Sequence, residues 1–270
     1  MADPAETGFP VPSRVVEHAR RFYASGAEPV TPRLASTVVL LRPDLEVYAI
    51  RRAATMAFAA GMLAFPGGSV DPRDATTQPA WAGPAPAHWA RRLGRDEASA
   101  RAVVCAAVRE VFEESGVLLA GPDESTVVGD VSGPDWEAAR TALEARGVGF
   151  AELLEQRRLV LRSDLLAPWS RWVTPEFEPR RYDTYFFLAR LPERQLTRRV
   201  GGEADHAVWA RPGELAAGGH TMLPPTLMTL RQLSAYSTVD DAMVAAAQRD
   251  AATAVMPRIE LGADRARLVV

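Results

Sequence analysis

Three glutamates on one predicted helix are the residues of this chain best suited to chemistry. They lie in the run Arg109-Glu110-Val111-Phe112-Glu113-Glu114-Ser115-Gly116. A helix turns by about 100° per residue, so the carboxylates of Glu113 and Glu114 lie within about 60° of Glu110, on one face. Like charges at this spacing repel one another. A bound cation would relieve the repulsion, and carboxylate oxygens suit Mg²⁺ or Mn²⁺.

The same residues also fit a plain solvated helix face with ion pairs such as Arg109–Glu113. Two glycines upstream, Gly67 and Gly68, follow Pro66 and indicate a turn. A strand that ends in such a turn could bring backbone oxygens near the acidic helix. The glycines and the glutamates together favour a metal site over a solvated surface.

The elements that must position these groups follow from local patterns. The best helix of the chain spans 96–116, with acidic residues in its first turn and Gly116 after its end. Two β-rich runs, 35–41 and 46–51, predict a hairpin. Further helices are predicted at 14–24, 136–146, 150–158, 226–234 and 239–254, and further strands at 172–173, 182–188 and 203–209, with a hairpin at 258–270.

Composition excludes several classes of protein. The 270 residues include 34 acidic and 31 basic side chains, a balance that excludes a generically basic nucleic-acid binder. No apolar run has the length of a transmembrane helix, and no secretory signal is visible. Cys105 is the single cysteine, which excludes an intrachain disulfide and favours a reducing cytoplasm. The sequence has neither lysine nor asparagine, which is typical of a GC-rich bacterial genome.

The acidic helix resembles a known motif. Arg109 to Val117 matches the second half of the Nudix box, and Phe65-Pro66-Gly67-Gly68 matches its usual opening. Gly68 and Arg109 stand 41 positions apart, about 27 more than the family pattern has. Where the family has a glutamate, counting forward from Gly68 gives Asp74 and counting back from Arg109 gives Arg101. The usual glutamate is therefore missing or displaced, and with it a support of the loop.

An interrupted box resembles the Nudix branch that includes the peroxisomal coenzyme A diphosphohydrolases of mammals. The similar stretches cover roughly residues 35–260 and lie at 58–68, 106–119, 172–175, 180–187, 223–225 and 257–259. Other coenzyme A-specific Nudix hydrolases have Arg-x-His before the box. This chain has Met56-Ala57-Phe58 there.

The resemblance implies an α/β fold, the Nudix α/β/α sandwich with a mixed sheet and extra helices. It divides the chain into an N-terminal arm, 1–33, and a single Nudix domain, 34–270. Within the domain it implies an insertion in the box at 72–100, a helical insertion at 121–165 and C-terminal helices at 222–256.

The resemblance also implies metal-dependent hydrolysis of a pyrophosphate bond in a nucleoside diphosphate derivative, such as coenzyme A or acyl-coenzyme A. Glu110, Glu114, Glu113 and the carbonyl of Gly68 would bind Mg²⁺ or Mn²⁺. Arg109 would orient a carboxylate. The water proton would go to Glu110 or to a distal base.

For the distal base we expect Glu203, with Glu176 and Glu178 as rivals. Arginine forks suit phosphate oxygens, so Arg51, Arg180 and Arg181 are the expected substrate ligands. Tyr182, Phe186 and Trp209 could stack on a base, although aromatic residues in strands are more often core.

Two alternatives to a coenzyme A substrate remain at this point. The substrate could be ADP-ribose, a dinucleotide or a capped RNA end, although the acidic balance does not support RNA. The chain could also be a nucleotide-binding regulator without catalysis, but such modules typically lose box carboxylates that survive here. The expected partner is a small nucleotide diphosphate, with no membrane and no nucleic acid. Members of the family often form homodimers, which these residues do not decide.

Overall fold

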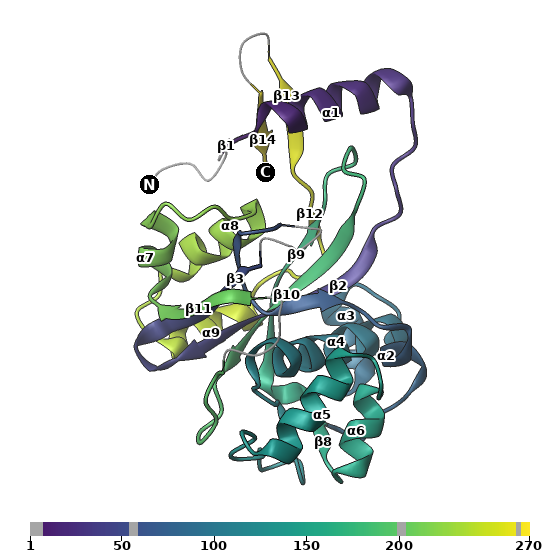
Figure 1. Cartoon of the computed structure of the whole chain (residues 1–270), viewed down its shortest axis with the longest axis vertical. Helices are drawn as coiled ribbons and strands as arrows, with labels where there is room; N and C mark the ends of the chain where they lie inside the picture. Colours follow the sequence, from purple (N-terminus) through teal and green to yellow (C-terminus); the bar gives the residue numbers. More distant parts are fainter. Residues whose placement is uncertain (1–7, 54–58, 199–203, 263–265) are drawn as a thin grey trace.

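A mixed sheet runs through the centre of the protein, here described from a computed structural model (Figure 1). The structure describes residues 8–53, 59–198, 204–262 and 266–270. The main sheet has the strand order β11-β3-β2-β10-β9-β12, with β4 beside β3 and β5 beside β2. β2 and β10 are parallel, whereas β2–β3, β10–β9 and β11–β3 are antiparallel. These strands are β2 (Arg33–Arg42), β3 (Glu46–Arg52), β4 (Leu63–Ala64), β5 (Gly67–Ser69), β9 (Leu166–Val173), β10 (Tyr182–Arg190), β11 (Ala204–Ala210) and β12 (Ala254–Val255).

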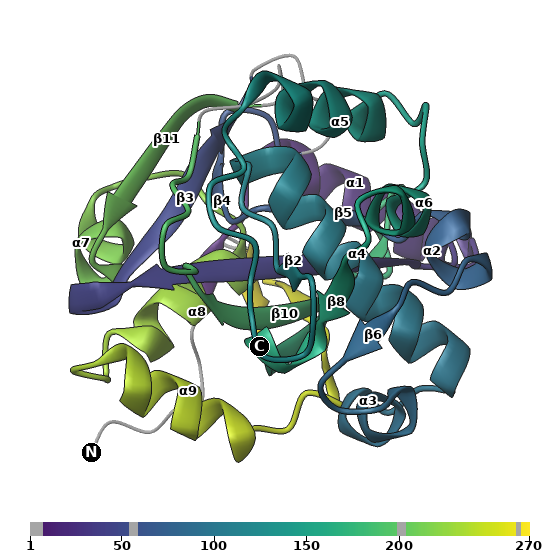
Figure 2. The same cartoon turned by 90° about the horizontal axis from the view of Figure 1, so that it is seen from below.

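Helices cover both faces of this sheet (Figure 2). One face packs on α4 (Glu97–Ser115) and its neighbour α3 (Pro86–Leu93), and the other packs on α7 (Pro212–Ala217), α8 (Pro224–Leu233) and α9 (Val239–Ala247). β2 shows why the sequence is apolar at successive positions: Val38 and Leu40 enter the first core, and Val39 and Leu41 enter the second. A strand buried on both faces needs such a continuous apolar run.

Two segments extend the sandwich on the α4 side. The segment 72–100, predicted as an insertion in the box, forms α2 (Pro72–Thr76), β6 (Trp81–Ala82) and α3. The second insertion contributes β7 (Ala120–Gly121), α5 (Pro134–Glu144), α6 (Phe150–Gln156) and β8 (Val160–Arg162), followed by the 3-10 turn 163–165. β6, β8 and β7 pair into a small sheet of their own, so the two insertions pack as one unit.

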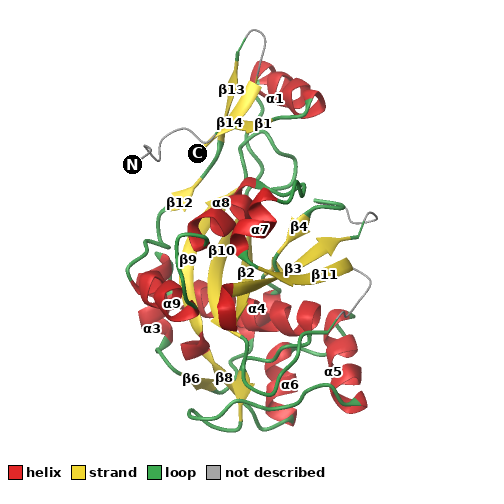
Figure 3. Ribbon diagram, turned by 90° about the vertical axis from the view of Figure 1, so that its left-hand side faces the viewer, coloured by secondary structure: helices red, strands yellow, loops and turns green. Residues whose placement is uncertain are grey.

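The two ends of the described chain meet in a third small sheet, set apart from the main one (Figure 3). β1 (Phe9–Pro10) pairs with β14 (Ala266–Val269), which pairs in turn with β13 (Arg258–Leu261). Helix α1 (Ser13–Ser25) lies beside this sheet and bonds to the loop before β10, where His18 Nε2 lies 2.7 Å from the carbonyl oxygen of Phe177. Within the described residues, no helix is both long and apolar enough to cross a membrane.

The mixed α/β sandwich confirms the predicted fold class, and most predicted elements occur within a few residues of their expected bounds. Two predictions of length were wrong. The last predicted helix, 239–254, ends at Ala247, because Ala254 and Val255 pair with β9 as a strand. The predicted strand 172–173 begins at Leu166 instead, since Pro168 does not prevent pairing with β10 at a register shift.

The fold predicts an inert thiol at Cys105. This side chain lies in α4, 2% exposed, and burial raises the pKa of its thiol to about 12. The thiol is therefore neutral at pH 8, and the reactive thiolate is scarce. We expect a disulfide reagent at pH 8 to label the native protein only slowly and the denatured protein fully. Rapid stoichiometric labelling of native protein would contradict this packing.

Candidate active site

The two glycines of the box opening lie in β5, where the chain passes between β2 and α4. Gly67 and Gly68 pair with Thr37 and Ser36 of β2. A Cβ on Gly67 would lie 2.5 Å from the backbone oxygen of Ser36. A Cβ on Gly68 would lie 2.5 Å from Oε1 of Glu110. Close approach of the β2 backbone therefore requires glycine at 67, whereas a side chain at 68 would push aside the carboxylate of Glu110.

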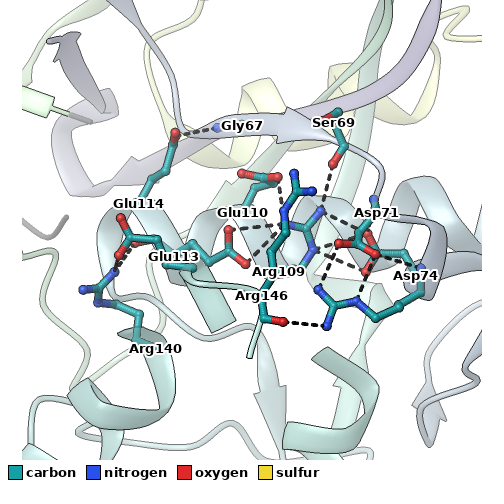
Figure 4. A network of polar contacts seen from close by, with 12 residues as sticks. Gly67, Ser69, Asp71, Asp74, Arg109, Glu110, Glu113, Glu114, Arg140 and Arg146 are labelled. Carbon is teal, nitrogen blue, oxygen red and sulfur yellow. Dashed lines mark hydrogen bonds and ion pairs between the residues drawn. The ribbon is translucent and has the colours of Figure 1, made fainter. Parts of the chain in front are cut away.

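Arg109 is the centre of the polar network (Figure 4). Its Nη2 donates to the carbonyl of Ser69 at 2.9 Å and to Asp74 Oδ2 at 3.0 Å. Its Nη1 donates to Glu110 Oε1 at 2.8 Å and to Glu113 Oε1 at 3.2 Å. One buried guanidinium thus ties the glycine strand, α2 and two of the box glutamates together.

Asp74 supplies the acidic partner that the sequence left unassigned. It is 5% exposed and lies in α2, whose N-cap is Asp71. Asp74 Oδ2 accepts from the backbone N–H of Asp71 at 2.9 Å and also from Arg109. Asp74 and Arg101 are the two residues that stand where the family pattern has its glutamate. Asp74 pairs with Arg109, whereas Arg101 donates to the carbonyl of Ala75 at 3.4 Å.

The electrostatics of the network show an excess of buried negative charge. Burial raises the pKa of Glu110 to about 7, against the opposing effect of Arg109. Burial also raises the pKa of Glu113 and that of Asp74, again despite the guanidinium. Burying a carboxylate is costly unless it is paired, and a single arginine serves three of them.

These residues fit a divalent cation in donor chemistry. Glu110, Glu113 and Glu114 lie on consecutive turns of α4, and Glu110 fills the space over Gly68. As the side chains stand, no three acidic, histidine or cysteine residues in the described ranges converge closely enough to hold an ion. Glu110 and Glu113 face Arg109, and Glu114 Oε2 accepts from the N–H of Gly67 at 2.7 Å. A bound ion would require the carboxylates to turn from these partners.

A cavity of about 490 Å³ opens beside the network. This volume lies in the range of small-molecule sites. Its acidic lining residues are Asp71, Asp74, Glu110, Glu113, Glu114, Glu144 and Glu178. Its basic lining residues are Arg52, Arg73, Arg109 and Arg146, and its larger apolar ones are Phe65, Leu143, Phe150, Trp172, Phe186, Leu223 and Leu268.

The predicted metal ligands all line the cavity, whereas the predicted substrate arginines do not. Gly68, Glu110, Glu113 and Glu114 all line the cavity. Arg51 and Arg180 are exposed and lie outside its lining. The side chain of Arg181 is buried and donates to the carbonyls of Thr174 and Val30, at 3.1 and 2.8 Å.

The three candidates for a distal base have different positions. Glu178 lies in the loop between β9 and β10 and lines the cavity, and burial raises its pKa. Glu176 is exposed and lies outside the lining. Glu203 lies outside the described residues, as does the sequence Met56-Ala57-Phe58.

The aromatic candidates divide in the same way. Tyr182 and Phe186 line the cavity. Trp209 instead packs on Tyr48 at 5.4 Å between ring centroids and under the guanidinium of Arg42 at 4.8 Å.

Sequence reasoning missed three of the cavity arginines. Arg52 lines the cavity one residue beyond Arg51, and the alternation of strand β3 was the signal that could have chosen between them. Arg73 and Arg146 come from the two segments predicted as insertions, and Arg146 lies beyond the end of α5 with a left-handed backbone that the predicted helix 136–146 did not anticipate.

Comparison with known proteins decides the family. The family model of the NUDT19 Nudix domain matches residues 90–231, more than half of the chain. This chain belongs to the Nudix hydrolase family. Its match to that model begins inside the box insertion and includes the whole of α4.

Other Nudix proteins resemble this chain over most of its length. It is 30% identical to putative nudix hydrolase 7 of Caenorhabditis elegans over 204 residues, 74% of this chain and 59% of that protein. It is 28% identical over 197 residues to acyl-coenzyme A diphosphatase NUDT19 of Gallus gallus, 65% of this chain and 49% of that protein. The chain therefore spans about half the length of these curated relatives.

A solved structure shows the Nudix fold directly. The NUDIX hydrolase from Alicyclobacillus acidocaldarius superposes with a TM-score of 0.64 at 30% sequence identity. The alignment covers 80% of this chain and 96% of that one. The central sheet and its flanking helices are therefore the Nudix sandwich that the box motif predicted.

The Nudix box of this chain predicts that Asp74 stabilises the fold. Replacement of Asp74 by alanine removes one partner of a buried ion pair and should lower the free energy of unfolding by about 3 kcal/mol. Asp74→Glu, which keeps the charge, should lose less. Denaturant unfolding measures both.

The matched control is Asp135→Ala, which breaks the exposed pair between Asp135 and Arg157. Exposed pairs contribute little, so this variant should unfold like the wild type. Equal stability of Asp74→Ala and Asp135→Ala would show that the buried pair does not support the site.

Proposed function

We propose that this protein hydrolyses a pyrophosphate bond in a nucleoside diphosphate derivative, with coenzyme A or acyl-coenzyme A as the favoured substrates. The observation that carries the proposal is the cavity beside β5, in which the box glutamates and the glycine turn meet. Water would add to one phosphorus while the bridging P–O bond breaks, and two phosphate monoesters would leave.

A divalent ion, Mg²⁺ or Mn²⁺, would neutralise the diphosphate and lower the pKa of a bound water. Glu110 and Glu114 are the proposed main ligands, with Glu113 and the carbonyl of Gly68 completing the set. Arg109 would touch no substrate in this arrangement, because its donors are committed to Ser69, Asp74 and the box carboxylates. Its role would be to position Glu110 and Glu113.

A base outside the box would receive the water proton. Glu178 suits this role because it lines the cavity and does not belong to the proposed ligand set. A carboxylate that is not bound to a metal ion is the stronger base, and its raised pKa increases its proton affinity. Glu203 remains the alternative. Glu110 is the candidate within the box.

The apolar part of the cavity suits a substrate with more than a diphosphate. Trp172, Phe186 and Phe65 are among the apolar residues that line the cavity together with the charged ones. Such surfaces bind bases and acyl chains. The name of the Gallus gallus relative, acyl-coenzyme A diphosphatase, supports the choice of coenzyme A derivatives over ADP-ribose or dinucleotides.

A metal-dependent screen tests the proposed activity. Purified protein with Mg²⁺ or Mn²⁺ should cleave coenzyme A or acyl-coenzyme A faster than ADP-ribose, NADH or diadenosine polyphosphates, and EDTA should abolish cleavage. Glu114→Gln should lower kcat/KM by at least about 100-fold, since loss of even an outer-shell partner of a metal typically costs up to that much.

Glu155→Gln is the control for this substitution, because Glu155 is exposed on α6 and lies outside the cavity lining. Wild-type activity in Glu114→Gln would refute the ligand assignment. Binding of these nucleotides without any cleavage would instead favour a regulator.

The base assignment has its own test. Glu178→Gln should lower kcat by roughly 100-fold or more, the usual contribution of a general base, while the dissociation constant of a divalent ion stays close to that of the wild type. Glu176→Gln, two residues away and exposed, should match the wild type. A loss in Glu203→Gln but not in Glu178→Gln would assign the base to Glu203.

A further inference from the structure

Arg146 is a cavity residue that no step of the proposed hydrolysis has used. It follows α5, in the helical insertion, and its neighbours Leu143, Glu144 and Phe150 line the same cavity. The inference drawn from it deepens the proposed function and rests on it.

The backbone at Arg146 is unfavourable for arginine. Its φ is 58°, in the left-handed region where glycine is preferred. It lies at the residue after the C-cap of α5, because its N–H bonds to the carbonyl of Leu143 and the N–H of Gly147 bonds to that of Ala142. Helices commonly end in this way, and glycine is the usual residue at this position.

The insertion fixes this corner relative to the Nudix box. Arg140, on the last turns of α5, donates to the carbonyl of Glu113 at 2.9 Å and is 3% exposed. Arg73 of α2 donates to the carbonyl of Arg146 at 3.2 Å. The backbone at Arg146 is thus fixed by two contacts, one from α5 to α4 and one from α2 to Arg146 itself.

The other cavity arginines are engaged with protein groups. Arg109 bonds to three carboxylates, and Arg73 forms a fork on Asp71, at 3.1 and 3.0 Å. Arg52 also has a partner. Within the described ranges, the guanidinium of Arg146 makes no hydrogen bond or ion pair, although seven carboxylates line the cavity.

We propose that Arg146 binds a phosphate group of the substrate and selects for the anionic diphosphate. A diphosphate that enters this cavity meets mainly carboxylates, so a cation not committed to the protein is the group that can offset the repulsion. The planar guanidinium gives two parallel donors that match phosphate oxygens.

The same insertion contains a matched control. Arg158 follows α6 with φ 54°, and its N–H and that of Leu159 bond to the carbonyls of Glu155 and Leu154 in the same pattern. Both arginines are exposed, but Arg158 lies outside the cavity lining. Since the strained backbone occurs at both arginines, the position in the cavity, and not the strain, carries the proposal.

Glycine substitutions separate the two effects. Arg146→Gly and Arg158→Gly should both keep or raise Tm, because glycine suits a positive φ. Only Arg146→Gly should lose kcat/KM toward coenzyme A and ADP-ribose, by roughly 10–100-fold, the cost of a charge-assisted hydrogen bond. The loss should fall mainly on KM, and Arg146→Lys should recover part of it. Wild-type kcat/KM in Arg146→Gly, or an equal loss in Arg158→Gly, would overturn the proposal.

Binding distinguishes this inference from the proposed function. Equilibrium dialysis of coenzyme A and ADP-ribose with Mg²⁺, in the Glu114→Gln background, measures affinity without turnover. Weaker binding on adding Arg146→Gly, but not Arg158→Gly, supports the arginine even if the wild type hydrolyses neither compound. Equal binding with and without Arg146, or no binding at all, refutes the assignment.

Discussion

The buried guanidinium of Arg109 is the interaction on which the site depends. A charge with so little exposure is tolerated only when carboxylates and carbonyls surround it, and here these come from α2, α4 and β5. Each of these partners is held in place by its ion pair or hydrogen bond with the arginine. The same contacts that stabilise the packing of α4 on the glycine strand therefore set the positions of Glu110 and Glu113.

This dependence explains how the box tolerates its interruption. The predicted insertion, 72–100, begins with helix α2, which Asp71 caps and which Asp74 ties directly to Arg109. The rest of the insertion leaves through β6 and α3 and returns at Asp96, the N-cap of α4. The entropic cost of a longer loop grows only slowly with its length, and pairing of β6 with β8 holds its middle.

Local signals in the sequence were sufficient for most of the fold and for the box. Gly116, for instance, ends α4 in the left-handed conformation that a terminal glycine predicts. The positions of Asp74 and Arg146 could not be predicted, because each depends on a packing between segments far apart in sequence. Arg51 and Arg52 are neighbours in β3, so their side chains point to opposite faces of the sheet, and only Arg52 lines the cavity. Arg181 was predicted to bind phosphate, but its guanidinium donates to two backbone carbonyls instead.

In the proposed function, different charged residues of the cavity serve catalysis and the selection of the substrate. The carboxylates that suit a cation lie on α4 and are held by the buried network, where a change disturbs the fold as well. Arg146, the proposed phosphate ligand, comes from the α5–α6 turn, whose backbone is anchored through Arg73 and Arg140 while its side chain is exposed. A residue at such a turn can vary without unpairing Arg109, since its guanidinium is not part of that network. A fold of this kind can keep one hydrolytic centre and change the anion that it admits through its insertions.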